Sequence, residues 1–549
     1  MLIHTDGLIH ALQLLFPLPH IQEALQCAKS QNQTLLNYLI HEQRVDSLSI
    51  AKACANYFSL KAIDLHQYSH LHFPLHHLND NQLRSQAILP IEQANDELTL
   101  AISDPAHFFL TDEIKFQTQL KIKIVFAPYD QLTLLTSKIL TKTILKSLRE
   151  NKNFHTDETI AATLIERLLN DAVFQNASDL HCEPMRHHYQ IRLRIDDILY
   201  PTAQLPSALV APLTSRLKIM AELDISEKRL PQDGRFTFMT TTKLHRDCRI
   251  SSLPTLFGEK IVVRILNPQT QLLDIHELGL EEKPKQQWIH AIQQSQGFIL
   301  VTGPTGSGKT NSLYTALQSL NTPQKNIITI EEPVEIQLDG INHINVNHKT
   351  GLDFSAALRA LLRQDPDIIM VGEIRDTETA NMAIRAAHTG HLVLSTLHTN
   401  SAAETLSRLL HMGISAFNVA SSVSLIIAQR LLRKLCHYCK TPIRLPPTVL
   451  LQAGFKAHEA TTVTLYQANQ CEFCIHGYKG RVGVFEVMPI SPALRELILQ
   501  QAPAQTINAA AEKEGVQSLK QSALNKARDG ITSLEEINRV IGIPTTTLF

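Results

Sequence analysis

The sequence contains little that would suit a membrane-spanning or a nucleic-acid-binding protein. No stretch reaches the roughly eighteen apolar residues that a membrane-crossing helix requires. The apolar "LIHALQLLFPLPHI" near the start is short, is interrupted by prolines and has no basic leader or cleavage site, so no signal peptide is predicted. Aromatic residues make up only 5 % and the net charge is −1, which argues against the interleaved aromatic and basic side chains that bind nucleic acid. These absences indicate a cytoplasmic protein without a nucleic-acid partner.

The length and the pattern of the chain predict several domains. Of the 549 residues, 44 % are hydrophobic, which is enough for several packed cores. We expect an N-terminal accessory or docking domain at 1–147, a polar linker at 148–158, a second N-terminal domain at 159–272 and a C-terminal domain at 273–549. In the last of these, apolar runs such as "FILVTG" and "DIIMVGE" alternate with helical segments. That alternation predicts an α/β fold with a mainly parallel sheet and helices on both faces.

The segment "GPTGSGKT" fits the phosphate-binding pattern G-x-x-x-x-G-K-[ST] and lies between an apolar strand and a helix. Its glycines let backbone N–H groups approach phosphates, and the helix directs its positive end at them. Lys309 supplies charge to the β- and γ-phosphates, and Thr310 supplies a hydroxyl for Mg²⁺. The sequence therefore predicts binding of ATP with Mg²⁺. The predicted nucleotide-binding residues are Gly303, Pro304, Thr305, Gly306, Ser307, Gly308, Lys309 and Thr310.

Carboxylates and histidines follow or flank other expected strands of this domain. Glu373 stands just past an apolar strand, where a carboxylate can reach the metal or the attacking water. The segment "TIEEPVE" ends another strand with Glu331 and Glu332, and only one of these is expected to face the phosphates because neighbours in a strand point to opposite faces. His391 and His398 flank the strand "LVLSTL", where a histidine can sense the γ-phosphate or contact a neighbouring subunit. For each residue taken alone, a solvated strand end, a helix cap or a packed histidine remains open.

Two C-x₂-C pairs predict a metal site. "CHYC" supplies Cys436 and Cys439, and "CEFC" supplies Cys471 and Cys474. Four thiolates at this spacing in a cytosolic protein are typical of a structural Zn²⁺ site, and a catalytic role is not expected because they close the coordination shell. Free cysteines or disulfides are the alternative, which a reducing compartment disfavours. The zinc insert is expected at about 433–480.

The order of these blocks resembles the secretion and pilus ATPase superfamily, which includes the type II secretion and type IV pilus motors. "GPTGSGKT", "TIEEPVE", "DPDIIMVGEIRD" and "TGHLVLSTLHTN" are similar to its Walker A, aspartate-box, Walker B and histidine-box blocks, and "ASDLHCEP", "EKRLPQDGR" and "GEKIVVRIL" are similar to its second N-terminal domain. The resemblance implies a RecA-like P-loop domain preceded by a PAS-like α+β domain and an N-terminal α/β domain. It implies that Arg249 and Arg264 reach the γ-phosphate as arginine fingers. Glu332 stands where the family usually has aspartate, so Glu373 is the preferred catalytic carboxylate.

The resemblance also implies a function and partners. A ring homohexamer at the cytoplasmic face of the inner membrane would hydrolyse ATP and drive an inner-membrane platform protein, contacting pilin only indirectly. The tetracysteine insert and the long N-terminal module favour a secretion or pilus assembly motor over a retraction motor. The segments "EPVEIQLDGINHINVN" and 351–431 are most similar to a pilus assembly motor, with type II secretion or DNA uptake as alternatives. A nucleotide-gated binding or signalling module is the alternative of another class. "LLNYLIHEQRVD" lacks the arginines and glycines by which some relatives bind cyclic di-GMP, so docking to a membrane complex is favoured over that ligand.

Overall fold

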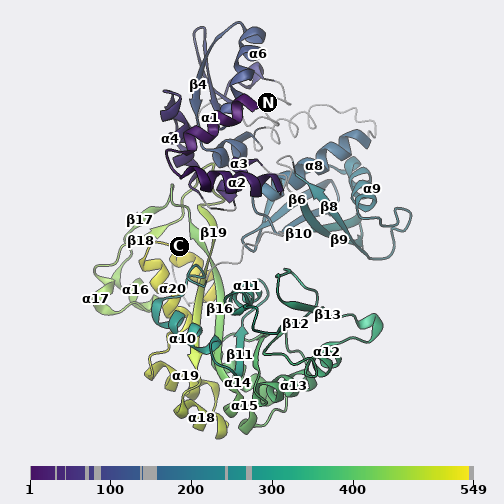
Figure 1. The fold of residues 1–549 in the computed structure, drawn as a ribbon, viewed down its shortest axis with the longest axis vertical. Helices are drawn as coiled ribbons and strands as arrows, with labels where there is room; N and C mark the ends of the chain where they lie inside the picture. Colours follow the sequence, from purple (N-terminus) through teal and green to yellow (C-terminus); the bar gives the residue numbers. More distant parts are fainter. Residues whose placement is uncertain are drawn as a thin grey trace. The chain divides into compact units, whose positions relative to one another are not determined.

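A computed structural model describes residues 2–30, 34–41, 43, 45–68, 73–78, 88–136, 139, 158–240, 245–266 and 275–542 (Figure 1). They form two compact units, the first mainly from residues 1–268 and the second mainly from residues 269–549. The linker expected at 148–158 lies outside the described residues, except for Glu158. In the described part of the chain, none of the helices combines the length and the apolar character that crossing a membrane requires.

The N-terminal region combines helices with a small mixed sheet. In the order β1-β4-β3-β2, the first two pairings are parallel and the last is antiparallel. Ile50 of a helix and Leu98 and Phe126 of two strands share one core. Asp46 caps a helix by accepting the N–H of Ser49 at 2.9 Å. The elements are α1 (Leu2–Leu12), α2 (Leu18–Ser30), α3 (Leu35–His41), α4 (Ser47–Tyr57), β1 (Lys61–Ala62), η1 (Leu65–Tyr68), η2 (Leu75–His77), β2 (Ile88–Ala94), β3 (Glu97–Ile102), η3 (Pro105–Phe108), α6 (Phe109–Thr118) and β4 (Lys121–Phe126).

The rest of the first unit is an antiparallel sheet with the strand order β7-β6-β5-β10-β9-β8. Buried and exposed side chains alternate along β9, as expected where one face is covered and the other is open. Leu168 and Leu217 of two helices pack against Leu180 and Ile250 of the strands, so the charged face is the opposite one. The elements are α8 (Glu158–Phe174), β5 (Asp179–Pro184), β6 (His188–Ile195), β7 (Ile198–Pro206), η4 (Ser207–Leu209), α9 (Val210–Met220), β8 (Gln232–Met239), β9 (His245–Thr255) and β10 (Gly258–Leu266).

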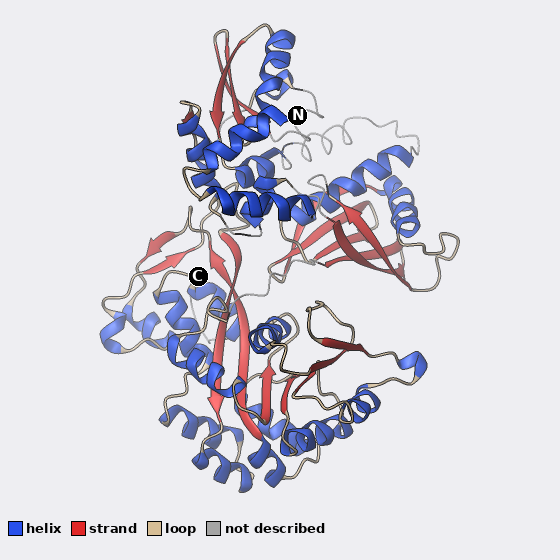
Figure 2. Ribbon diagram, in the orientation of Figure 1, coloured by secondary structure: helices blue, strands red, loops and turns tan. Residues whose placement is uncertain are grey.

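The second unit is built on a seven-stranded sheet in the order β13-β12-β14-β15-β11-β16-β19. All neighbouring strands are parallel except β16 and β19, which are the long ribbons of this unit in Figure 2. Strands β11 and β15 are buried at every residue, as strands covered on both faces are. The strands are β11 (Gly297–Thr302), β12 (Ile327–Glu331), β13 (Asn342–Asn345), β14 (Ile368–Val371), β15 (Leu392–Leu397), β16 (Val423–Leu435) and β19 (Tyr478–Pro489), with a separate pair β17 (Thr441–Ile443) and β18 (Leu465–Gln467).

Helices cover both faces of this sheet through two separate cores. One core holds Leu300 and Ile369 with helices on one face, and the other holds Val301 and Met370 with helices on the other. The predicted α/β fold with a mainly parallel sheet is confirmed. The helices are α10 (Glu282–Ile292), α11 (Lys309–Leu320), η5 (His348–Thr350), α12 (Phe354–Leu361), α13 (Thr377–His388), α14 (Ala402–His411), α15 (Ala416–Ser422), α16 (Pro447–Ala453), α17 (Ala457–Ala460), α18 (Pro492–Leu499), α19 (Ala504–Lys513), α20 (Leu519–Arg528) and α21 (Leu534–Ile541).

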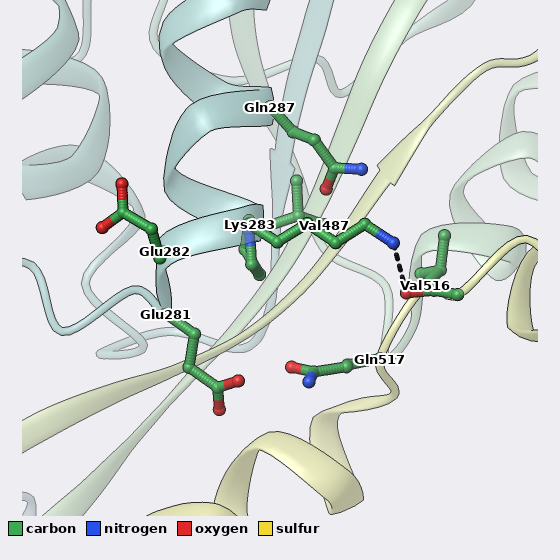
Figure 3. A pocket seen from close by; sticks show the side chains of 9 residues that line it. Glu281, Glu282, Lys283, Gln287, Val487, Val516 and Gln517 are labelled. Carbon is green, nitrogen blue, oxygen red and sulfur yellow. Dashed lines mark hydrogen bonds between the residues drawn. The ribbon is translucent and has the colours of Figure 1, made fainter.

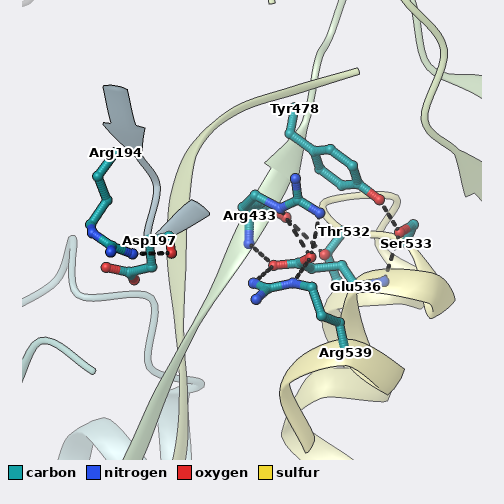
Figure 4. Close-up of polar contacts among 8 residues, drawn as sticks. All are labelled: Arg194, Asp197, Arg433, Tyr478, Thr532, Ser533, Glu536 and Arg539. Atoms are coloured by element: carbon teal, nitrogen blue, oxygen red, sulfur yellow. Dashed lines mark hydrogen bonds and ion pairs between the residues drawn. The ribbon is translucent and has the colours of Figure 1, made fainter. Parts of the chain in front are cut away.

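A buried ionic cluster joins the last helix, α21, to strand β16 (Figure 4). The carboxylate of Glu536 is fully buried and accepts from Nη2 of Arg433 at 2.7 Å and Nη2 of Arg539 at 2.6 Å. The guanidinium of Arg433 also lies over the ring of Tyr478, whose hydroxyl is 2.7 Å from Oγ of Ser533. Burial alone would raise the pKa of Glu536, but the hydrogen bonds from both arginines outweigh it and hold that pKa below its usual value. The carboxylate is therefore ionised within the folded protein.

Candidate nucleotide site

The predicted phosphate loop connects β11 to α11. Gly303 has φ 153° and Gly308 has φ 86°, and a Cβ on Gly303 would lie 2.5 Å from the carbonyl oxygen of Gln429. These positions need glycine, because the backbone is left-handed at both and closely approached at the first. Helix α11 begins at Lys309, directly after the loop, so the free N–H groups of its first turn are available to an anion. The local structure is thus one that can receive the phosphates of a nucleotide.

The side chain of Lys309 lies folded back on the loop. Its Nζ donates to the carbonyl oxygen of Gly303 at 2.9 Å and to that of Pro304 at 3.0 Å. Burial lowers the pKa of Lys309 to about 8, although the charge of Glu373 opposes the shift. A phosphate would offer this ammonium a charged acceptor in place of two neutral ones, and charge-assisted hydrogen bonds are roughly twice as strong as neutral ones. The loop therefore holds Lys309 ready to exchange its partners.

Two predicted catalytic carboxylates meet at the same edge of the sheet. Strands β12 and β14 are parallel neighbours, so their carboxyl ends lie together, with Glu332 directly after β12 and Glu373 shortly after β14. A single guanidinium joins them: Nη1 of Arg375 lies 2.9 Å from Oε2 of Glu332, and its Nη2 pairs with Oε1 of Glu373. The hydrogen bond to Glu373 raises the pKa of Arg375. The cluster therefore has two acidic groups and one permanent positive charge.

Histidines occupy the other oxygens of these carboxylates. Nε2 of His398 lies 3.5 Å from Oε2 of Glu373, and Nε2 of His348 lies 2.6 Å from Oε1 of Glu332. His391 precedes β15 and His398 follows it, so the two lie at opposite ends of that strand. The Nδ1 of His391 contacts a backbone carbonyl oxygen of α13 at 2.9 Å. The structure thus brings His398, but not His391, to the acidic groups.

The neighbouring Glu331 has a different environment. Its carboxylate is buried and accepts from the hydroxyls of Tyr314 at 2.5 Å and Thr329 at 2.7 Å. Nδ1 of His343 lies 3.1 Å from it, and that nitrogen carries the proton because Nε2 accepts the N–H of Leu338. Burial, and after it the contact with Glu331, raises the pKa of Tyr314. Glu331 thus ties α11 to β12 inside the domain, while Glu332 lies with Glu373.

Arg375 and His348 were not predicted from the sequence. Arg375 stands two residues after Glu373 in "GEIRD", and a basic side chain so close to an expected catalytic carboxylate is a usable signal. His348 gives no such signal. It lies 16 residues from Glu332 and reaches it only because the chain returns past β13. No spacing rule for helices or strands predicts that contact.

The predicted arginine fingers lie on the exposed face of the antiparallel sheet. Arg264 on β10 is the register partner of Arg249 on β9, which in turn is the partner of Arg235 on β8. The three arginines and Asp179 border one pocket of about 400 Å³. Nε of Arg264 donates to Oδ1 of Asp179 at 2.9 Å. The sheet register therefore concentrates positive charge at one place, with Asp179 as a partner for one arginine.

The four predicted zinc ligands lie together. The sulfur atoms of Cys436, Cys439, Cys471 and Cys474 are all within 4.8 Å of one another. A tetrahedral Zn²⁺ with Zn–S bonds of about 2.3 Å requires sulfur–sulfur separations of about 3.8 Å, and Cys471 and Cys474 are 3.4 Å apart. The donor set and its spacing therefore fit zinc. Among the described residues, these four cysteines are the group of His, Cys, Asp or Glu side chains whose ligand atoms lie close enough together to hold a metal ion.

A pocket of about 260 Å³ in the second unit lies at the start of α10 (Figure 3). Figure 3 shows Glu281, Glu282 and Lys283 around it, with Gln517 opposite. Nζ of Lys283 donates to the carbonyl oxygen of Gly515 at 3.4 Å. Its lining contains no residue of the phosphate loop and neither of the carboxylates paired with Arg375, so it is separate from the nucleotide site.

Comparison with known proteins assigns the family. The model of the type II/IV secretion system protein family matches residues 155–539. The chain belongs to this family. The resemblance expected from the sequence blocks is thereby confirmed, and an MshEN domain matches residues 58–141.

Relatives within the family extend the match over nearly the whole chain. The chain is 44 % identical over 532 residues to the type IV pilus assembly ATPase PilB of Pseudomonas aeruginosa, covering 93 % of this chain and 94 % of that protein. It is 42 % identical to the type II secretion system protein E of the same organism, covering 70 % and 76 %. The X-ray structure of the Legionella pneumophila ATPase DotB aligns with a TM-score of 0.51 at 21 % identity, over 71 % of this chain and 96 % of that one. That last likeness shows the fold alone.

Proposed function

We propose that this chain is a motor ATPase that hydrolyses ATP to power type IV pilus assembly. The observation that carries the proposal is its similarity, over almost its full length, to a pilus assembly ATPase. The local geometry supports it, because a glycine-rich loop, the ammonium of Lys309 and the carboxylate of Glu373 occupy one edge of a parallel sheet. Ligands of such sheets bind at the carboxyl ends of the strands.

The roles of the residues follow from their chemistry. The loop amides and Lys309 hold the β- and γ-phosphates, and Thr310 offers a hydroxyl to Mg²⁺. The metal ion, when bound, neutralises charge on the phosphates. Glu373, which is 21 % exposed and paired with Arg375, orients the attacking water. Glu332 and His398 assist by fixing the surroundings of that carboxylate. His391, at the far end of β15, is assigned to contact with a neighbouring subunit.

Arg249 and Arg264 are proposed as arginine fingers that couple hydrolysis to movement. We assign the second unit to the RecA-like class and the antiparallel domain to the PAS-like class, in a ring homohexamer. Arg264 exchanges Asp179 for the γ-phosphate when nucleotide binds, since the phosphate carries more negative charge. Departure of the phosphate releases the arginines, and the domains change their relative position. An inner-membrane platform protein would convert this movement into pilin insertion, and pilin itself would be contacted only indirectly.

The remaining parts receive structural or docking roles. The four cysteines are proposed to hold a structural Zn²⁺. The N-terminal domain is proposed to dock on a membrane complex, which places the ring on the cytoplasmic face of the inner membrane. Type II secretion is the second candidate, and the 42 % identity to a type II secretion protein favours it over DNA uptake and over a signalling module. Expression in a host lacking its pilus assembly ATPase distinguishes pilus assembly from type II secretion, because only a pilus motor restores pili.

Glu373→Gln tests the catalytic assignment. The amide keeps the shape of the side chain but cannot accept a proton or orient water as strongly, so we expect ATP hydrolysis to fall by at least about 10²-fold with ATP binding retained. Turnover is measured by phosphate release and binding by a fluorescent ATP analogue. Glu378→Gln is the matched control, because Glu378 is 60 % exposed and pairs with Arg359 on the surface of the same unit. Hydrolysis by Glu373→Gln at the rate of the control would overturn the assignment.

A further inference from the structure

Arg375 is the centre of a row of five side chains at the carboxyl edge of the sheet. Its Nη1 lies 2.9 Å from Oε2 of Glu332 and its Nη2 pairs with Oε1 of Glu373. The second oxygen of each carboxylate has a histidine beside it, His348 at 2.6 Å from Glu332 and His398 at 3.5 Å from Glu373. Each carboxylate therefore has two fixed neighbours, and Arg375 is the neighbour that they share.

The need for this cation follows from the charges around it. Glu332 and Glu373 are only 25 % and 21 % exposed, so water screens their mutual repulsion poorly. The side chain of Arg375 is 60 % exposed, which allows it to stay hydrated while its two terminal nitrogens pair with the two carboxylates. A guanidinium has donors in a rigid planar fork, so it can hold two carboxylates at a fixed separation, whereas an ammonium is a point charge. The bridge thus sets the orientation of Glu373.

We propose that Arg375 is a positioning residue for ATP hydrolysis, which holds Glu373 in its water-orienting position by tying it to Glu332. This inference rests on the proposed ATPase function. It assigns Arg375 to the chemical step, because its partners are the two carboxylates, whereas Lys309 contacts the phosphate loop. A displacement of about 1 Å in a catalytic group can cost about a hundredfold in rate. Loss of the bridge should therefore lower kcat and leave KM for ATP nearly unchanged.

The test compares three variants of the full chain by steady-state ATP hydrolysis. Arg375→Gln removes both ion pairs, and we expect kcat to fall by about a hundredfold with KM within about threefold of the wild type. Arg375→Lys restores the charge without the fork, so its kcat should be intermediate. Arg359→Gln is the control, since Arg359 is 61 % exposed and forms a surface ion pair with Glu378 at 2.5 Å, and it should behave as the wild type. Binding of a fluorescent ATP analogue shows that each variant is folded.

The outcomes separate the inference from the function on which it rests. A wild-type chain that does not hydrolyse ATP would overturn both. An active wild type with Arg375→Gln equal to Arg359→Gln would overturn the role of Arg375 alone. A rise in KM at constant kcat would also overturn it, because the guanidinium would then act by attracting nucleotide. Full rescue by lysine would show that charge suffices and that the fork is not needed, which contradicts the positioning role.

Discussion

At the scale of single residues, two cations for which we propose contacts with phosphate each have a partner within their own unit. Lys309 donates to two carbonyl oxygens of the loop, and Arg264 donates to Asp179. In each case the partner is one that a phosphate can replace, because a phosphate carries more charge than a carbonyl or a carboxylate. For Lys309, which is buried, this pairing also limits the cost of holding a cation away from water. Under the proposed function, nucleotide binding would then be an exchange of partners for Lys309 and Arg264.

Neutralising the two proposed arginine fingers tests their role at this scale. Arg249→Gln combined with Arg264→Gln should lower kcat by about 10³-fold or more, since arginine fingers contribute about 10³ to 10⁵ to phosphoryl transfer. ATP binding to the phosphate loop should persist, because the loop and Lys309 are unchanged. Phosphate release and binding of a fluorescent ATP analogue measure the two quantities. Arg229→Gln, which removes an 87 % exposed arginine paired with Glu227, is the control, and a double variant as active as this control would contradict the assignment.

At the scale of elements, neighbouring strands decide which side chains meet. Strands β12 and β14 are adjacent and parallel, so the residues that follow them lie at one edge, and this is why Glu332 and Glu373 share a cation. The alternation of side chains along β12 sends the preceding Glu331 into the interior, where it accepts from Tyr314 of α11. Two neighbouring residues therefore have different roles: Glu331 connects β12 to α11 inside the domain, and Glu332 lies beside Glu373.

The cluster between α21 and β16 gives a prediction about pH. The pKa of Glu536 is held below its usual value, so its contribution to stability is present above about pH 4.3, the ordinary glutamate pKa, and is lost as pH falls through the lower folded value. Glu536→Gln leaves Arg433 buried without its counter-charge, and we expect a loss of about 3–5 kcal/mol at neutral pH. The difference in unfolding free energy between Glu536→Gln and the wild type should shrink as the pH falls below about 4.3.

Calorimetric unfolding of the full chain checks the predicted pH dependence of the Glu536→Gln effect. The measurements run from about pH 3.5 to pH 7, a range that brackets the ordinary glutamate pKa. Glu282→Gln serves as the control, because Glu282 is 68 % exposed and its pairing with Lys285 is a surface contact. That variant should unfold as the wild type does at every pH. An unchanged unfolding temperature for Glu536→Gln at neutral pH would show that the buried cluster does not stabilise the unit.

At the scale of the whole molecule, we expect several separate cores and one predicted metal site to stabilise the fold. The chain has distinct buried clusters for the N-terminal sheet, for the antiparallel sheet and for each face of the large sheet. The tetracysteine insert contains the strand pair β17 and β18 and the short helices α16 and α17, and its Leu450 and Phe455 belong to a further core. A region of such short elements gains from a metal that fixes its ligands, because metal binding supplies folding free energy directly.

Removal of the metal should therefore destabilise the insert. We expect about one Zn²⁺ per chain in the purified protein, and Cys471→Ser should lower that content and the unfolding temperature together. Elemental analysis and calorimetry measure the two. Cys248→Ser, which changes a buried thiol of the antiparallel sheet outside the cluster, should keep its zinc. A wild-type protein without zinc, or a Cys471→Ser variant that retains it, would contradict the assignment.

The sequence alone determined the features that depend on residues close together in the chain. The phosphate loop, the two C-x₂-C pairs and the alternation of apolar strands with helices could be read from spacing, because their physics is local. Periodicity also required Glu331 and Glu332 to face opposite ways. Periodicity alone does not predict which of the two glutamates is buried, because burial depends on which helix covers β12.

Only the tertiary structure decided the contacts between segments that are distant in sequence. It placed Arg375 between Glu332 and Glu373, brought His348 to Glu332, and set Arg264 against Asp179. It also placed His391 and His398 at opposite ends of β15. From the sequence, where they are seven residues apart around a strand, both were candidates for the site. The physical reason is that strand order and register in a sheet are fixed by packing over the whole domain. The partners of a side chain at a strand end are therefore not encoded in its own neighbourhood.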